Sequence, residues 1–360
     1  MSSQRLVHGP AREVWARLQE WQAASSRPDP LVIETSGSTG EPKRVLLSRT
    51  AMRASATATH TRLGGPGQWL LALAPTHVAG SQVLFRSVLA GAEPVMLPEH
   101  DDFPAAARAM AGPRRYTSLV PTQLTRMLSS ERDLAALRTF DAILLGGAAI
   151  DPDMRGAAEQ AGLRIVSTYG MSETCGGCVY DGVALDGVAV AISAEGRVRL
   201  AGPVLFDGYD GRPDLTTQVL KDGWFVTSDL GRLDEDGRLQ VLGRVDDVVV
   251  SGGINVPTPA VAARIREHPG VLAAEMVGVP DPHWGQRVVA VVVTSREVDL
   301  EVVRDFVSER LPRPWAPKEL VVVDDIPLLS NGKVDRLRLG RLVAASPTTD
   351  AGTRKGGGPA

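Results

Sequence analysis

The chain has very little cysteine: only Cys175 and Cys178 occur among its 360 residues. No second cysteine pair completes a zinc set of the usual composition. The C-x-x-C spacing leaves a redox pair or half of a metal site as alternatives. The glycine-rich neighbours, Thr-Cys-Gly-Gly-Cys-Val, are typical of a turn that leads into a strand. They favour packing in the structure or in a substrate pocket.

Long apolar runs and a strong charge imbalance are also lacking. No run approaches the roughly 20 apolar residues that span a bilayer, and the first 15 residues lack the apolar core of a secretory signal, so we expect a cytoplasmic protein without membrane insertion. A formal net charge of −3 gives no reason to expect a nucleic-acid partner. The oligomeric state is left open, with a homodimer as one alternative.

What the chain does have is enough length and apolar content for two domains with a substantial core. Short apolar segments alternate with segments of helical periodicity through its first half, which predicts an α/β fold with a mainly parallel sheet. We expect helices over 11–24, 49–62, 80–91, 104–111 and 121–129, and strands over 31–33, 69–74, 94–97, 116–120, 142–145 and 163–167.

The pattern changes after residue 188. Glycine turns at Glu195-Gly196 and Asp236-Gly237 predict a β-rich subdomain over 188–243. A unit of the order α-β-β-α-β follows, with helices at 259–267 and 299–310 and strands at 272–278, 288–294 and 320–323. The domains we expect are a large N-terminal α/β domain (1–245), a small mobile α+β domain (246–345) and a disordered polar tail (346–360).

The segment from Thr35 to Lys43, Thr-Ser-Gly-Ser-Thr-Gly-Glu-Pro-Lys, has the composition of a phosphate-binding loop. Its hydroxyls and glycines leave backbone N–H groups free to point at phosphate oxygens, and Lys43 adds a cation. It lacks the spacing of a Walker-type loop, and a plain surface turn is the alternative. The phosphate ligands that it predicts are Thr35, Ser36, Gly37, Ser38, Thr39, Gly40 and Lys43.

A second basic site follows 290 residues after the loop, at Ser330-Asn331-Gly332-Lys333. A solvated surface lysine is the alternative at such a turn. A cation on a small C-terminal module is nevertheless what a domain needs if it must swing in to complete a site. Together with the loop, Lys333 suggests ATP-driven activation of a carboxylate.

Further segments, in the order of the chain, resemble the blocks of the adenylate-forming (AMP-binding, acyl-CoA ligase) superfamily. They read LLGGAA at 144–149, YGMSET at 169–174, WFVTSD at 224–229, GR at 243–244 and PLLSNGKV at 327–334. The resemblance covers most of residues 31–339. It implies an AMP-forming acid–thiol ligase that uses ATP, Mg²⁺ and CoA.

The same resemblance assigns the nucleotide contacts. Gly147 and Ala148 would lie against adenine and Tyr169 would stack on it, while Asp229 and Arg244 would contact ribose. A carboxylate suits the ribose because it accepts two parallel hydrogen bonds from a cis-diol. The residues that would act on the phosphates and metal are Ser172, which would bond phosphate, and Glu173, which would help to hold Mg²⁺.

In the smaller domain, the resemblance makes Asp246 the hinge and Lys333 the catalytic cation that bridges the substrate carboxylate and the α-phosphate. Ser251, Gly252 and Gly253 would form a loop that faces the site during thioester formation. One well-placed cation in a dry site contributes several kcal/mol to a charged transition state. No carrier-protein domain follows, which disfavours a modular peptide synthetase.

Within the superfamily, the chain resembles most the o-succinylbenzoate–CoA ligases of menaquinone biosynthesis, of a compact actinobacterial type. The segments APTHVAG (74–80) and SLVPTQL (118–124) and the early phosphate loop support this. An acid with two carboxylates needs polar groups to orient it, for which the sequence offers His77, Thr122, Gln123, Ser167 and Gly170.

Three alternatives stay open. His77 could cap the helix that is expected near Gly80. The acid could be another aryl or short-chain carboxylate. The chain could also be a non-catalytic relative that binds nucleotide as a sensor, against which the intact Lys333, Glu173 and Asp229 argue.

Overall fold

The chain folds into two units, Met1–Val241 and Leu242–Ala360, in a computed structural model. The structure describes residues 7–25, 28–35, 43–327 and 334–345, apart from the side chains of Asp246, Arg336 and Leu337. The expected domain boundary after residue 245 stays a prediction. The expected tail at 346–360 lies outside the described residues.

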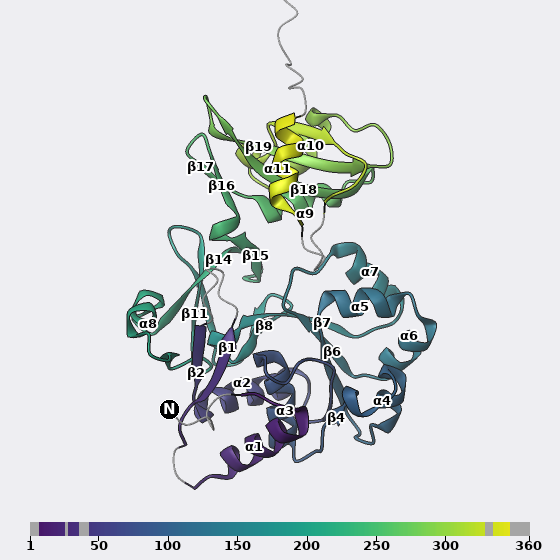
Figure 1. Ribbon diagram of the computed structural model, residues 1–360, viewed down its shortest axis with the longest axis vertical. Helices are drawn as coiled ribbons and strands as arrows, with labels where there is room; N and C mark the ends of the chain where they lie inside the picture. The colour runs from purple at the N-terminus through teal and green to yellow at the C-terminus, as the bar shows by residue number, and fades with distance from the viewer. Residues whose placement is uncertain (1–6, 26–27, 36–42, 328–333, 346–360) are drawn as a thin grey trace, which may run out of the picture. The chain divides into compact units, whose positions relative to one another are not determined.

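A seven-stranded sheet forms the centre of the first unit, with the strand order β4-β3-β5-β6-β7-β8-β9 (Figure 1). The pairs from β4 to β7 are parallel, and β8 and β9 continue the sheet antiparallel. The expected mainly parallel sheet is therefore confirmed. The strands are β3 (Gln68–Leu71), β4 (Val95–Met96), β5 (Arg115–Leu119), β6 (Ala142–Gly146), β7 (Ile165–Met171), β8 (Gly176–Tyr180) and β9 (Val183–Ala184).

Helices cover both faces of this sheet, because consecutive apolar residues of a strand point to opposite faces. Trp69 and Leu71 belong to one core cluster, whereas Leu70 between them belongs to the other. The first cluster includes α1 (Ala11–Ala23), α2 (Arg49–Arg62) and α3 (Val78–Ala90). The second includes α4 (Phe103–Ala109), α5 (Pro121–Leu128), α6 (Glu131–Leu137) and α7 (Pro152–Gln160).

Two antiparallel sheets complete the first unit. The smaller has the order β1-β2-β12 and contains β1 (Leu31–Thr35), β2 (Lys43–Leu47) and β12 (Gly208–Tyr209). Thr35 and Lys43, the two ends of the predicted phosphate loop, therefore lie on paired strands outside the main sheet. The larger sheet has the order β10-β11-β14-β13, with β15 paired to β14, and confirms the β-rich texture after residue 188. Its elements are β10 (Ala189–Ile192), β11 (Arg197–Ala201), β13 (Leu220–Lys221), β14 (Trp224–Leu233) and β15 (Leu239–Arg244), with α8 (Pro213–Val219) inserted.

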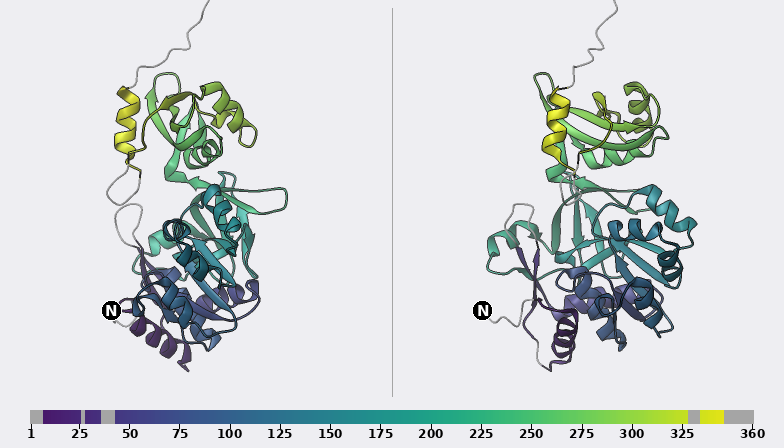
Figure 2. Two further views of the ribbon diagram at one scale, coloured as in Figure 1. Left: turned by 90° about the vertical axis from the view of Figure 1, so that its right-hand side faces the viewer. Right: turned by 45° about the vertical axis from the view of Figure 1, so that its right-hand side comes forward.

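The second unit is a five-stranded sheet between helices. Alternation along β19 sends Val288 and Ala290 to one core cluster and Val289 and Val291 to the other. Figure 2 shows α11, in yellow, on the opposite side of this sheet from α9 and α10. The elements are β16 (Val248–Ser251), β17 (Ile254–Pro257), α9 (Thr258–Arg266), β18 (Val271–Asp281), β19 (Gly285–Thr294), α10 (Leu300–Ser308), β20 (Glu319–Val322) and α11 (Arg336–Ala345).

The sequence predicted most of these elements to within a few residues, and the expected helix at 49–62 matches α2 in both bounds. It missed α6, α7, α8 and α11, each of which has at most 10 residues. None of the helices among the described residues combines the length and the apolar character of a membrane span.

Candidate active site

The parallel strands β5, β6 and β7 place several predicted residues at one edge of the main sheet. Gly147 and Ala148 follow β6 directly and are exposed, and Thr122 lies in the first turn of the helix after β5. Gly147 has φ +83°, a conformation that glycine adopts without strain. In open α/β sheets, ligands bind outside the carboxyl ends of such strands. This edge is therefore the candidate nucleotide site.

Tyr169 and Asp229 are brought together by two different sheets. The phenol of Tyr169, on β7, donates a 2.7 Å hydrogen bond to Oδ2 of Asp229 on β14. Burial, and then the adjacent carboxylate, raise the pKa of Tyr169 far above its usual value, so the phenol stays protonated as a donor. Thr227 fixes the backbone by accepting a bond from the N–H of Asp229 at 3.0 Å. Tyr169, which is predicted to stack on adenine, and Asp229, which is predicted to bind ribose, are thus neighbours.

Glu173 lies in a short 3-10 turn, Ser172–Thr174, that follows β7. The phenol of Tyr209, on β12, donates a 2.8 Å hydrogen bond to Oε1 of Glu173. Burial, followed by the Glu173 carboxylate, raises the pKa of Tyr209 well above its usual range. On the Tyr209 ring lies Lys43, whose Nζ is 5.4 Å from the centroid. Tyr209 therefore joins the phosphate loop to the acidic turn.

Sequence reasoning missed Tyr209. It lies 36 residues from Glu173 in a two-residue strand, and a Gly-Tyr pair in a β-rich region carries no signal of its own. Only the pairing of β12 with β2, Tyr209 opposite Val45, places the phenol beside the phosphate-loop hairpin.

The two ends of the phosphate loop are closed by the β1–β2 hairpin. Thr35 pairs with Lys43 across the two strands, and the Thr35 hydroxyl donates to the Lys43 carbonyl at 3.4 Å. The predicted ligands between them, Ser36, Gly37, Ser38, Thr39 and Gly40, lie outside the described residues.

The predicted acid-orienting residues differ in their surroundings. Both ends of the Gln123 amide are engaged, since Nε2 donates to Ala72 O at 2.8 Å and Oε1 accepts from Val120 N at 3.0 Å. Likewise, the Ser167 hydroxyl donates to Oδ1 of Asp181 at 2.9 Å. These contacts hold strand ends in place, and a further contact with substrate stays a prediction.

His77 is exposed and occupies the N-cap position of α3, but its side chain makes no capping hydrogen bond. Its imidazole is thus available beyond the carboxyl end of β3. Thr122, which is also exposed, lies beyond the carboxyl end of β5. Gly170 has a structural requirement: a Cβ there would lie 2.1 Å from the Gly176 carbonyl oxygen. The close approach of β7 and β8 therefore requires glycine at this position.

Both cysteines are buried free thiols. Burial raises the pKa of Cys178 to about 12 and also raises that of Cys175. Thiolate is the form that binds metals and attacks disulfides. No group of three metal-ligating side chains occurs among the described residues either. The arrangement favours the packing interpretation of the C-x-x-C segment.

Of the residues predicted for the second unit, Arg244, Asp246 and the segment from Ser251 to Gly253 are among the described ones. Arg244 ends β15, a strand that begins in the first unit and ends in the second, and Asp246 lies in the turn Val245–Asp247. The β16–β17 hairpin turns at Gly252 and Gly253, both with positive φ, after a buried Ser251. Lys333 lies outside the described residues.

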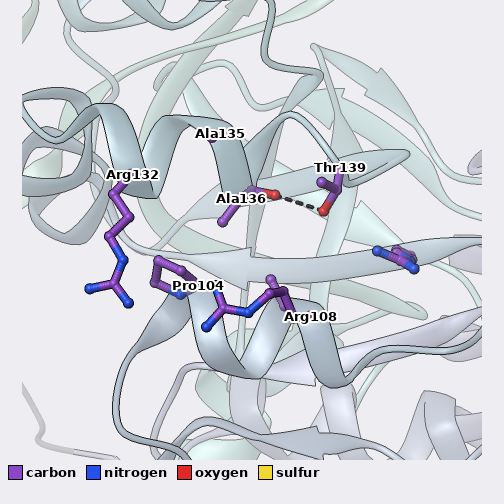
Figure 3. A pocket seen from close by; sticks show the side chains of 8 residues that line it. Pro104, Arg108, Arg132, Ala135, Ala136 and Thr139 are labelled. Atoms are coloured by element: carbon purple, nitrogen blue, oxygen red, sulfur yellow. Dashed lines mark hydrogen bonds between the residues drawn. The ribbon is translucent and has the colours of Figure 1, made fainter.

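A hollow of about 270 Å³ between α4, β5 and α6 does not contain any of these residues (Figure 3). Pro104, Ala136 and exposed arginines such as Arg108 and Arg132 line it. Because the predicted nucleotide residues gather at the strand ends instead, the hollow is not the candidate active site.

Family models match both units. The model of the AMP-binding enzyme matches residues 9–209, and that of the AMP-binding enzyme C-terminal domain matches residues 260–333. The first covers more than half of the chain. It includes the phosphate-loop hairpin, the turn with Glu173, and Tyr209.

Named relatives are similar over nearly the whole chain. The probable 2-succinylbenzoate–CoA ligase of Mycobacterium tuberculosis is 45% identical over 324 residues, 87% of this chain and 84% of that protein. The 2-succinylbenzoate–CoA ligase of Bacillus anthracis is 32% identical over 362 residues, 94% of this chain and 74% of that protein. The solved o-succinylbenzoate CoA synthetase (MenE) of Bacillus subtilis, in complex with the acyl-adenylate intermediate OSB-AMP, is 27% identical. It has a TM-score of 0.67 and covers 86% of this chain and 68% of its own.

Proposed function

The chain belongs to the AMP-binding enzyme family, and from this premise we propose that it joins 2-succinylbenzoate to CoA while ATP is converted to AMP and pyrophosphate. The observation that carries the substrate is the 45% identity with the mycobacterial 2-succinylbenzoate–CoA ligase over 87% of this chain. The reaction is a step of menaquinone biosynthesis. Because ATP and CoA are the co-substrates, the proposed compartment is the cytoplasm.

The first unit binds ATP in this proposal. The base lies against Gly147 and Ala148, and the ribose hydroxyls donate to Asp229, whose Oδ2 is held by Tyr169. The triphosphate follows the hairpin that ends at Lys43. The acid lies at the same sheet edge, near His77 and Thr122. This arrangement brings a substrate carboxylate oxygen to the α-phosphorus, where a new P–O bond forms and pyrophosphate leaves.

Magnesium fits this site through a single carboxylate. Glu173 is held by Tyr209 at 2.8 Å, and no cluster of three acidic, His or Cys side chains lies among the described residues. Mg²⁺ commonly takes one or two carboxylates and fills its remaining positions with phosphate oxygens and water. Bound there, the cation would neutralise charge on the triphosphate. Glu173 is the residue that would hold it, and Ser172 beside it would donate to phosphate.

The second unit supplies Lys333 in this proposal. The lysine balances the charge that builds between the carboxylate and the α-phosphate during adenylation. A turn about Asp246 then replaces it with the Ser251–Gly253 hairpin. In the second half-reaction, the CoA sulfur bonds to the acyl carbon as the thiolate, and AMP leaves with the bonding electrons of the C–O bond. Two reactions at one site explain why the cation is carried by a separate unit.

The test is a panel assay. Purified protein is supplied with ATP, Mg²⁺, CoA and one acid at a time, drawn from 2-succinylbenzoate, benzoate, other aryl acids and short aliphatic acids. We expect AMP and a thioester with 2-succinylbenzoate, and much slower turnover with the others. A thioester from another acid, with none from 2-succinylbenzoate, would show that the substrate assignment is wrong and leave the ligase chemistry standing.

A further inference from the structure

The residue that follows the Glu173 turn has an unusual backbone. Cys175 has φ +53° and ψ +37°, the left-handed region, and it is one of three non-glycine residues with positive φ among those described. A non-glycine residue there costs about 1–2 kcal/mol. Strain of this size persists only where surrounding contacts determine the conformation.

Two buried side chains from different helices supply such contacts. The Ser55 hydroxyl, on α2, donates to the Cys175 carbonyl oxygen at 3.0 Å. The Gln82 amide, on α3, donates through Nε2 to the same oxygen at 2.8 Å. Both side chains have an exposed fraction of 0%. Since a carbonyl oxygen has two lone pairs, these two donors saturate it.

The orientation of Gln82 is set by this contact at an energetic cost. Its Oε1 is buried and has no hydrogen-bond partner in the described part of the chain. An unsatisfied buried acceptor costs about 1–3 kcal/mol. Turning the amide over would point Oε1 at the Cys175 oxygen, acceptor against acceptor. The Gln82 amide is therefore held in the orientation that lets Nε2 donate to the Cys175 carbonyl.

The strained residue is coupled to the turn that carries Glu173. The Cys175 N–H donates to Ser172 O at 3.1 Å, and the Thr174 hydroxyl donates to Gly176 O at 2.7 Å. The Glu173 carbonyl accepts from Phe206 N at 2.9 Å. If Cys175 moved to a relaxed conformation, Ser172 and Glu173 would move with it, away from the Tyr209 phenol.

We propose that Ser55 and Gln82 are positioning residues that clamp Cys175 in its left-handed conformation and so set Glu173 for the metal–nucleotide complex. The inference rests on the role proposed above for Glu173. It concerns two fully buried side chains, of which Ser55 is 120 residues and Gln82 is 93 residues from Cys175 in the sequence.

The experiment compares binding and half-reactions in the double variant S55A/Q82M, in which methionine keeps the volume of glutamine. Affinity for Mg·ATP, measured by calorimetry, is expected to fall about tenfold, and affinity for ATP in EDTA to change less than threefold. The KM for Mg·ATP in adenylation should rise by the same factor. Thioester formation from presynthesised acyl-adenylate should stay within twofold of the wild type.

Rescue by glycine separates positioning from general stability. In the double variant, Cys175→Gly should restore most of the Mg·ATP affinity, because glycine adopts the left-handed conformation without the clamp. Cys175→Ala, which removes the same thiol but keeps a Cβ, should not. Ser87→Ala is the matched control, since the hydroxyl of this buried serine on α3 donates to Val83 O within its own helix.

Two outcomes would overturn the clamp: wild-type Mg·ATP affinity in the double variant, or equal effects of glycine and alanine at position 175. If the double variant does not fold, the single variants Ser55→Ala and Gln82→Met test the clamp instead. Each is expected to weaken Mg·ATP binding about threefold, and wild-type affinity in both would overturn the clamp. The binding measurement needs no acid, so it is independent of whether 2-succinylbenzoate is the substrate.

Discussion

The phenol of Tyr169 and the carboxylate of Asp229 are joined by a 2.7 Å hydrogen bond between residues 60 positions apart. The bond orients one carboxylate oxygen and leaves Oδ1 without a hydrogen bond from the described residues. A ribose cis-diol requires such a fixed acceptor. The pair thereby ties the main sheet to the β-rich sheet at the point where the nucleoside is proposed to bind.

Replacing Asp229 by asparagine should raise the KM for ATP by roughly 10- to 100-fold, because hydrogen bonds to a charged acceptor contribute about 1.5–3 kcal/mol. Tyr169→Phe, which removes only the orienting bond, should raise it less than Asp229→Asn does. ATP–pyrophosphate exchange at several ATP concentrations measures both. An unchanged KM in Asp229→Asn would remove Asp229 from the nucleotide site.

Tyr209→Phe should weaken Mg·ATP binding by about 5- to 10-fold, the equivalent of one lost hydrogen bond of about 1–1.4 kcal/mol. The ring remains, so its contact with Phe206 and with the Lys43 ammonium is kept. Tyr116→Phe is the matched control, because that phenol bonds to Leu63 O and Gly65 O. Tyr116→Phe should lower the free energy of unfolding and leave the KM for Mg·ATP unchanged. Equal KM values for Mg·ATP in Tyr209→Phe and Tyr116→Phe would refute the prediction.

Lys333→Ala should abolish pyrophosphate release from ATP and acid while sparing thioester formation from presynthesised acyl-adenylate. The reason is that charge at the α-phosphate builds only in the first half-reaction. Rapid-quench measurements of the two half-reactions check this. Equal loss in both would contradict the proposed swing of the second unit.

The stability of the fold should fall in mild acid because of His60. This side chain has an exposed fraction of 7%, and burial, followed by the charge of Arg86, lowers its pKa from 6.5 to about 4. Between pH 6.5 and about pH 4, the imidazole of His60 therefore binds a proton in the unfolded chain but not in the folded chain. The contribution of His60 is complete above pH 6.5 and is lost as the pH falls from 6.5 towards 4, by up to about 1.4 kcal/mol per pH unit.

Urea unfolding of the wild type and of His60→Gln at pH 7, 6 and 5 tests this. The variant should lose less stability between pH 7 and pH 5, although it starts from a lower value if the packing beside Trp69 suffers. Parallel pH profiles would show that His60 does not titrate as expected.

The two cysteines should resist alkylation in the folded protein. Both thiols are buried, and burial raises the pKa of Cys178 to about 12 and raises that of Cys175 as well. Iodoacetamide at pH 8 should therefore label them only at the rate at which the chain unfolds, and addition of urea should release full reactivity. Rapid labelling of native protein, counted by mass spectrometry, would support a reactive role for the C-x-x-C segment instead.

Local patterns in the sequence determined a large part of this protein. Alternation such as Trp69-Leu70-Leu71 fixes which side chains face each helical layer, because successive residues of a strand point to opposite faces. The glycines at 147, 170 and 252 mark turns and a close strand approach. The order of the family blocks also identified the chemistry correctly.

Only the tertiary structure decided which distant residues meet. Tyr209, Ser55 and Gln82 lie 36, 120 and 93 residues from the backbone or side chain that they hold, and no local periodicity records such contacts. The left-handed conformation of Cys175 was equally hidden, because its local sequence does not favour it over other turns. Such features arise when separate elements pack together, since each buried donor must then find an acceptor wherever the fold supplies one.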